Sequence, residues 1–244
     1  MLSKALKFKS DKTCAKLINS FQEVNYMLML TPQGFFGFEV LLEMLFAIII
    51  FIVATMGFKI YRITSQSQAF YLSWAFLLIG ISKVFESILN ILIITKLNEN
   101  ICQVAKINSV HMFNNIGMYI HILFMIVGLS LLTFMTFKSE EIRGFLLIVG
   151  LSLISIFVSN NILYSFFTIS SFLLIIVSWF FIKNYLRHKN TKTLLIGIAF
   201  LFLLFGNIHF LFAVNHSLFY IIGLVLELIA YGLILSNFFM VLKR

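Results

Sequence analysis

The sequence of 244 residues is 61% hydrophobic and only 11% charged, and its mean hydropathy is +1.04. These values exclude an ordinary water-soluble globular domain, because a chain this apolar needs lipid as its solvent. A formal net charge of +9 would favour nucleic acid as the partner of a soluble protein. Here most basic residues lie between apolar runs, where the positive charge of cytoplasmic loops accounts for them, and no nucleic-acid partner is expected.

The chain begins with a basic tail, residues 1–34, in which apolar positions follow a helical period only in part. This tail is predicted to be an interfacial amphipathic helix or to be poorly ordered. Residues 35–244 are predicted to form the transmembrane domain. The single proline, Pro32, precedes all of its apolar runs, so continuous helices are expected.

A helix that crosses the bilayer needs about 20 mostly apolar residues, and this length is the criterion for each span. Seven segments meet or approach it: 35–58, 69–94, 116–137, 142–158, 162–182, 193–214 and 218–242. The predicted fold is therefore an all-α integral membrane protein with about seven transmembrane helices. The fourth segment is the shortest, and if it belongs to a helical hairpin with the fifth the number falls to six or five.

The distribution of Lys and Arg predicts the orientation of these spans. With the first helix starting outside, the inner loops and the C-terminus hold ten basic residues: Lys59, Arg62, Lys138, Arg143, Lys183, Arg187, Lys189, Lys192, Lys243 and Arg244. The outer loops hold two, Lys96 and Lys106. Five lysines of the tail oppose this bias but do not outweigh it. We expect a multi-pass protein of the cell membrane with its N-terminus outside and its C-terminus in the cytoplasm.

Ionisable residues within the spans are the best functional indication, because a charge at the bilayer centre costs about 2.5–3.5 kcal/mol on insertion scales. Placed by depth, they fall in the outer half of the membrane, and helical spacing puts most of them on inward faces. The predicted ligand- or ion-binding residues are Glu39, Glu43, Lys83, Glu86, His121, His209, Glu227 and Tyr231. Asn207 and His209 are only two residues apart, so one of them is expected to pack elsewhere.

Two interpretations of these residues stay open. In the structural one, Lys83 pairs with Glu86 or another glutamate, and the histidines bind backbone or carboxylate partners that hold helices together. In the functional one, Lys83 neutralises one carboxylate and leaves up to three that must be protonated, hydrated or bound to a cation in an outward-facing cavity. His121 and His209, at similar depth on different helices, are candidate ligands of a haem or divalent metal.

The sequence has no phosphate-binding glycine loop, no HExxH and no GxSxG motif, so no catalytic residue is predicted and an enzyme is not the expected class. The C-terminal run FGNIHFLFAVNHSLFYIIGLVLELIAYGLILSNFFMVLKR, residues 205–244, has a histidine near the outer face, a short turn, a central acid and a basic end. It resembles the last two helices of prokaryotic seven-helix membrane input modules that precede histidine kinases and other signalling outputs.

This resemblance implies a receptor-like or sensory module that acts through a partner protein or as a homo-oligomer in the membrane. An alternative is a transporter, channel or proton-handling subunit of a larger membrane complex. A second alternative is an intramembrane haem protein or enzyme. Continuous helices and few polar residues in the inner half count against a complete ion pathway.

Overall fold

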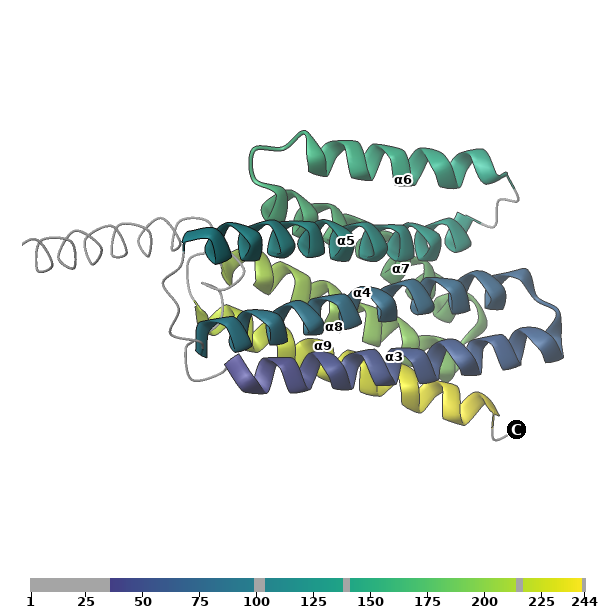
Figure 1. Cartoon of the computed structure of the whole chain (residues 1–244). Helices are drawn as coiled ribbons and strands as arrows, with labels where there is room; N and C mark the ends of the chain where they lie inside the picture. Colours follow the sequence, from purple (N-terminus) through teal and green to yellow (C-terminus); the bar gives the residue numbers. More distant parts are fainter. Residues whose placement is uncertain (1–35, 99–103, 138–140, 214–216, 243–244) are drawn as a thin grey trace, which may run out of the picture.

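The structure of the protein is a computed structural model that describes residues 36–98, 104–137, 141–213 and 217–242. Within these residues the chain is all helical, as the sequence predicts (Figure 1). The helices are α3 (Phe36–Thr64), α4 (Ser67–Asn98), α5 (Val104–Phe137), α6 (Ile142–Phe157), α7 (Ile162–His188), α8 (Thr191–Ala213) and α9 (Ser217–Leu242). The predicted basic tail, residues 1–34, lies outside the described residues.

Six of these helices are long and apolar enough to cross a membrane, which confirms the multi-pass membrane fold. The seventh, α6, has 16 residues. At about 1.5 Å per residue it is roughly 24 Å long, which is shorter than a bilayer core of about 30 Å. Successive helices run in opposite directions, and α6 follows this alternation (Figure 1). The fourth predicted span is therefore a separate helix, and this helix is shorter than the other six.

The six long helices form a closed ring. Along it α3 packs on α4, α4 on α5, α5 on α7, α7 on α8, α8 on α9, and α9 returns to α3. Helix α6 lies outside this ring against α5 and α7 (Figure 1). Its side chains Leu146, Leu147 and Ile154 are exposed, as expected for a helix that has lipid on most of its circumference.

Small residues allow the ring helices to approach one another closely, as is common where lipid supplies no hydrophobic force between helices. A Cβ atom added to Gly57 of α3 would lie 2.4 Å from Ser73 Oγ of α4. One added to Gly128 of α5 would lie 3.0 Å from the carbonyl oxygen of Ala75 on α4. The glycines therefore set the spacing between neighbouring helices.

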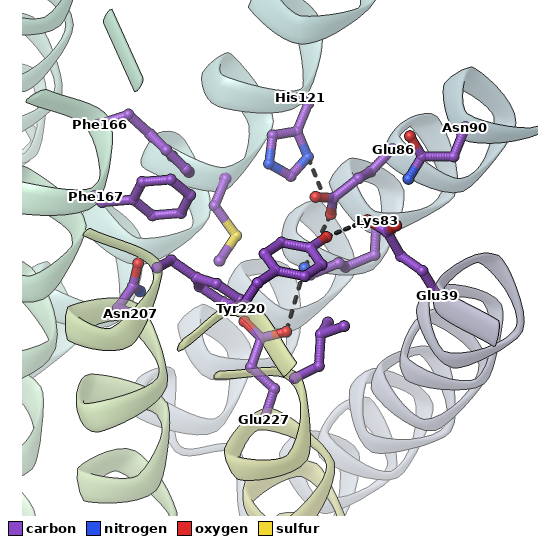
Figure 2. Close-up of a pocket in the computed structure, with 13 residues that line it drawn as sticks. Glu39, Lys83, Glu86, Asn90, His121, Phe166, Phe167, Asn207, Tyr220 and Glu227 are labelled. Carbon is purple, nitrogen blue, oxygen red and sulfur yellow. Dashed lines mark hydrogen bonds and ion pairs between the residues drawn. The ribbon is translucent and has the colours of Figure 1, made fainter. Parts of the chain in front are cut away.

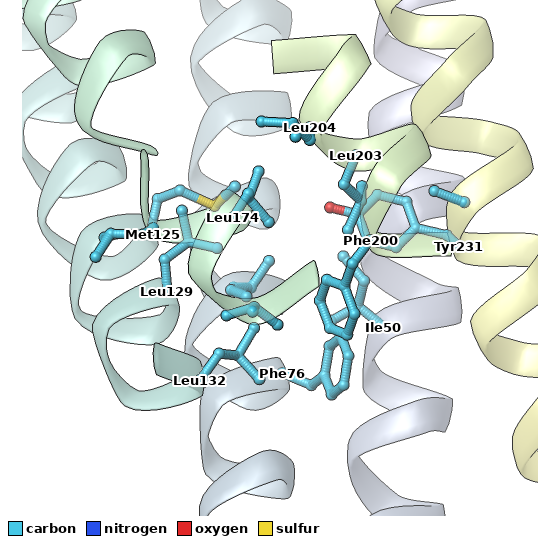
Figure 3. Packing of buried hydrophobic residues seen from close by; sticks show 14 of the residues in the cluster. Ile50, Phe76, Met125, Leu129, Leu132, Leu174, Phe200, Leu203, Leu204 and Tyr231 are labelled. Atoms are coloured by element: carbon cyan, nitrogen blue, oxygen red, sulfur yellow. The ribbon is translucent and has the colours of Figure 1, made fainter. Parts of the chain in front are cut away.

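The interior of the ring is divided into an apolar and a polar part. Large hydrophobic side chains fill one part, and Phe200 packs between Phe181 and Phe76 with ring centroids 5.3 and 6.5 Å apart. Figure 3 shows this packing around Ile50, Phe76, Leu129, Leu132, Leu174 and Phe200. The charged residues occupy the other part, toward the end where α3 and α9 begin. The apolar packing closes the interior of the ring on one side of these charges.

Candidate functional site

Four glutamates and one lysine gather inside the ring, on the consecutive helices α9, α3 and α4. Glu39 lies in the first turn of α3 and Glu43 one turn later, Lys83 and Glu86 lie on α4, and Glu227 lies in the middle of α9. Glu39, Lys83 and Glu227 are only 4–5% exposed. Side chains of this kind are almost never buried singly, so their partners decide what the cluster can do.

Lys83 is the centre of the cluster. Its Nζ atom lies 2.9 Å from Glu86 Oε2, one turn along the same helix, and 3.4 Å from Glu227 Oε2 across the ring (Figure 2). The shorter contact is also a hydrogen bond, whereas Glu227 Oε2 makes no hydrogen bond within the described residues. Lys83 thus joins α4 to α9, and it is committed more closely to Glu86.

Two uncharged polar residues bind the carboxylates of α3. The hydroxyl of Tyr220, on α9, donates to Glu39 Oε1 (Figure 2). Asn90 Nδ2, on α4, lies 3.0 and 2.9 Å from the two carboxylate oxygens of Glu43. These hydrogen bonds tie α3 to both of its neighbours in the ring, and they show that part of the polar network has a structural role.

His121 of α5 completes the polar wall. Its Nδ1 atom lies 2.9 Å from Ser82 Oγ, 3.2 Å from the Ser82 carbonyl oxygen and 3.7 Å from Glu86 Oε2. The Ser82 hydroxyl donates its own proton to the His121 carbonyl oxygen, 2.8 Å away. The His121 ring also packs edge-on against Phe166, with centroids 5.7 Å apart.

A small cavity lies among these side chains (Figure 2). It offers about 30 Å³ to the centres of water-sized molecules, which is room for roughly two of them at about 10–15 Å³ each. Its polar lining consists of Glu39, Lys83, Glu86, Asn90, His121, Asn207, Tyr220 and Glu227, and its apolar lining consists of Met125, Phe166, Phe167, Phe210 and Leu224. The cavity is suited to an ion or a molecule of very few atoms.

The structure brings together most, but not all, of the predicted site residues. Glu39, Lys83, Glu86, His121 and Glu227 line the cavity. Glu43 is buried next to this lining through its bond to Asn90. Tyr231 lines a second, smaller cavity of about 10 Å³ on the apolar side, whose lining also includes Asn207 and Glu227.

His209 lies away from the cavity, and Asn207 takes its place in the lining. The Nδ1 atom of His209 lies 2.7 Å from the Phe205 carbonyl oxygen one turn back, and its ring packs on Phe219 with centroids 5.8 Å apart. A spacing of two residues turns the side chains of Asn207 and His209 about 200° apart around a helix, which explains why only one of them reaches the interior.

The two histidines therefore do not form a common ligand site. His121 is held by Ser82 on α4, and His209 is held by the backbone of its own helix. In the part of the chain that the structure describes, no three His, Cys, Asp or Glu side chains are grouped to hold a metal ion. The pair does not fit the bis-histidine haem or divalent metal site that the sequence suggested.

The aromatic part of the lining could not be identified from the sequence. Phe166 and Phe167 come from α7, Phe210 from α8 and Tyr220 from α9. The sequence holds 30 phenylalanines spread over all spans, so no phenylalanine stands out. The position of Tyr220 seven residues before Glu227 was the one available signal, because that spacing puts both on one helix face.

Comparisons with protein-family models, with curated proteins and with solved structures find no match. The function must therefore be argued from the cluster and its cavity.

Proposed function

We propose that the protein is a receptor-like module of the cell membrane that binds a small cation or polar molecule in the cavity among Glu39, Glu86, His121 and Glu227. Ligand binding would change the ion-pair link between α4 and α9 across the ring, and a partner protein or a second copy of the chain would respond at the cytoplasmic end.

The observation that carries this proposal is the excess of carboxylates around a small cavity. Within the described residues, Glu86 and Glu227 share the ammonium group of Lys83, and Glu43 is bound by Asn90, which brings no positive charge. The carboxylates around Lys83 therefore exceed it in charge. An uncompensated buried carboxylate is costly, so a bound proton or a bound cation is expected to supply the missing positive charge. A cavity at this place gives a cation somewhere to bind.

The apolar packing on one side of the cluster favours binding over conduction. Phe76, Leu132 and Phe200 belong to the hydrophobic core and line the second cavity on its apolar side. An ion that crossed this region would lose its hydration without finding polar partners. A polar cavity that apolar packing separates from the other end of the ring can bind a ligand but cannot easily conduct it, as in a receptor.

The expected topology supports a signalling direction. Basic residues of α3, α7 and α8 gather at the end opposite the site, among them Lys59, Arg62, Lys183 and Arg187. This end is expected to face the cytoplasm. The resemblance of residues 205–244 to seven-helix input modules supports the same function, and it implies that the signalling output belongs to another protein.

Proton handling within a larger complex is the second candidate. Glu227 and Asn207 line both cavities, so the polar surface continues past the main site toward Tyr231. A proton relay needs such a continuation. The apolar packing beyond Tyr231 makes this candidate the weaker of the two.

The proposal is tested by measuring the thermal stability of the purified protein while small cations and polar molecules are added singly. A ligand that binds the folded state stabilises it by about 2.7 kcal/mol at one hundred times its dissociation constant, which raises the melting temperature. We expect stabilisation of the wild type, none of Glu227→Gln, and stabilisation of Glu141→Gln. Glu141 is an exposed acid before α6 and serves as the control.

Equal responses of the wild type and Glu227→Gln would contradict the proposed site. A complete lack of response to all ligands, in a wild type shown to be folded by size-exclusion chromatography, would contradict the proposed function.

A further inference from the structure

Two acceptors of the cavity lining make no hydrogen bond within the described residues. The first is Glu227 Oε2, which is ion-paired with Lys83 Nζ at 3.4 Å without forming a hydrogen bond. The Glu227 residue is only 4% exposed, so solvent does not supply the donor freely. Because this ion pair lacks a hydrogen bond, Glu227 Oε2 can still accept one from a ligand.

The second acceptor is His121 Nε2. Three oxygen atoms surround Nδ1: Ser82 Oγ, the Ser82 carbonyl oxygen and Glu86 Oε2. The Ser82 hydroxyl has already donated its proton to the His121 carbonyl oxygen, so it can only accept at Nδ1. The partners thus assign the ring proton of a neutral His121 to Nδ1. Nε2 is then an acceptor, and no hydrogen bond to it is found in the described part of the chain.

Aromatic rings from three helices form much of the remaining wall: Phe166, Phe167, Phe210 and Tyr220. An ammonium group close to aromatic faces gains about 0.5–1 kcal/mol at exposed sites and about 2 kcal/mol when it is desolvated. The cavity therefore combines anionic oxygens, a neutral acceptor and aromatic rings.

The cavity already contains one ammonium group, that of Lys83, bound between two carboxylates. A second cation would balance the charge around Lys83, because Glu86 and Glu227 would then face two positive charges. The room of about 30 Å³ admits a ligand of one or two heavy atoms.

We propose that the ligand is a small ammonium ion, either ammonium itself or methylammonium, which donates N–H hydrogen bonds to Glu227 and to His121 Nε2. This inference rests on the proposed function and specifies its ligand. A bare metal ion fits less well, because it requires several converging anionic or imidazole ligands. At least four of the eight carboxylate oxygens accept hydrogen bonds from Lys83, Asn90 or Tyr220, and no three ligand side chains are grouped to hold a metal ion in the described residues.

The experiment is isothermal titration calorimetry of the purified full-length protein in lipid nanodiscs, in a buffer free of amines. The four probes are the chlorides of ammonium, methylammonium, potassium and tetramethylammonium. We expect the first two to bind. Potassium has a similar charge and size but no N–H donor, and tetramethylammonium has neither a donor nor the small size, so both are expected to bind at least roughly tenfold more weakly.

Two variants locate the site. Glu227→Gln should weaken methylammonium binding by roughly tenfold or more, because it removes a charged acceptor. Phe166→Leu should weaken it by roughly fivefold through the loss of an aromatic face. Phe172→Leu is the matched control on the same helix, since Phe172 is 63% exposed on the outside of the ring. Because Phe166→Leu changes no charge, it keeps the test informative if Glu227→Gln fails to fold.

Potassium binding as tight as ammonium, and lost in Glu227→Gln, would overturn the ammonium assignment and leave the proposed cation site intact. Binding of none of the four cations to the folded wild type would overturn the ammonium assignment. Methylammonium binding unchanged in both Glu227→Gln and Phe166→Leu would overturn the placement of the site.

Discussion

Lys83 supplies the positive charge that compensates two glutamates of the cluster, so a substitution of Lys83 is expected to affect the stability of the protein. Its ammonium group lies between Glu86 and Glu227, and removing one member of a buried ion pair leaves the other charge without compensation. A role in ligand binding alone would predict that Lys83→Met abolishes binding without affecting folding. The structure changes that expectation, because Lys83 also connects α4 to α9.

Lys83→Met is therefore expected to lower the free energy of unfolding by about 3–5 kcal/mol. The double variant Lys83→Met/Glu227→Gln should recover part of this loss, since the amide removes one of the stranded charges. Equilibrium unfolding in mixed detergent micelles measures both. A Lys83→Met protein within about 1 kcal/mol of the wild type would show that the ion pairs contribute little.

The charged residues of the site were predictable and its aromatic wall was not. Charge inside a span is costly enough that Glu39, Lys83 and Glu227 stand out in any apolar sequence. The same argument placed His209 in the site, but helical spacing allowed only one of Asn207 and His209 to face inward. Phe166 and Phe210 carry no such signal, because a phenylalanine is equally stable against lipid and against a cavity.

At the scale of the helices, glycines govern how closely α4 and α5 approach. Gly128→Ala would place a Cβ atom 2.7 Å from Ile79 Cγ1 and 3.0 Å from the Ala75 carbonyl oxygen. Crowding of this kind destabilises by about 1–3 kcal/mol, which outweighs the better helix propensity of alanine. Gly150→Ala on α6 is the matched control.

Gly150 has nothing within 4 Å of an added Cβ, so its variant should gain up to about 1 kcal/mol in the free energy of unfolding. Thermal unfolding followed by size-exclusion chromatography compares the two variants. A Gly128→Ala protein as stable as Gly150→Ala would mean that α4 and α5 are not in close contact.

Helix α6 tests the number of crossings. With the native Cys14 and Cys102 replaced by serine, single cysteines are introduced at Glu141, Asn160 and Asn190, which are exposed before α6, after α6 and after α7. A membrane-impermeant maleimide applied to intact cells should label Asn160→Cys alone, and permeabilised cells should label all three. Labelling of Glu141→Cys and Asn160→Cys from the same side would show that α6 does not cross.

The positions of the helices followed from the sequence, but their arrangement did not. Apolar length alone places the first span at 35–58, although α3 continues through Lys59 and Arg62 to Thr64. Exclusion of α6 from the ring depends on which faces carry glycine and serine against a neighbour, and uniformly apolar helices hide those faces. A helix that is apolar on all sides is easy to recognise as a membrane span. It shows no polar and apolar face, so the helices that pack against it are hard to predict.

As a whole, the molecule is a ring of six helices. One half of its interior holds the charged cavity, and apolar side chains fill the other half. Basic residues lie at the end of the ring next to the apolar half. Buried carboxylates beside a cavity favour the proposed binding site over a membrane scaffold, and the apolar packing at the other end favours it over a pore. The proposed function requires that the carboxylates bind a ligand in addition to Lys83, Asn90 and Tyr220.

The most direct test is the stoichiometry of radiolabelled methylammonium binding to the purified protein at equilibrium. We expect one methylammonium per chain, displaced by ammonium more readily than by potassium, and binding to Glu227→Gln that is weaker by roughly tenfold or more. Absence of saturable methylammonium binding to the folded wild type would contradict the ammonium site, and the acidic cluster would then be an internal ion-pair network that holds α3, α4 and α9 together.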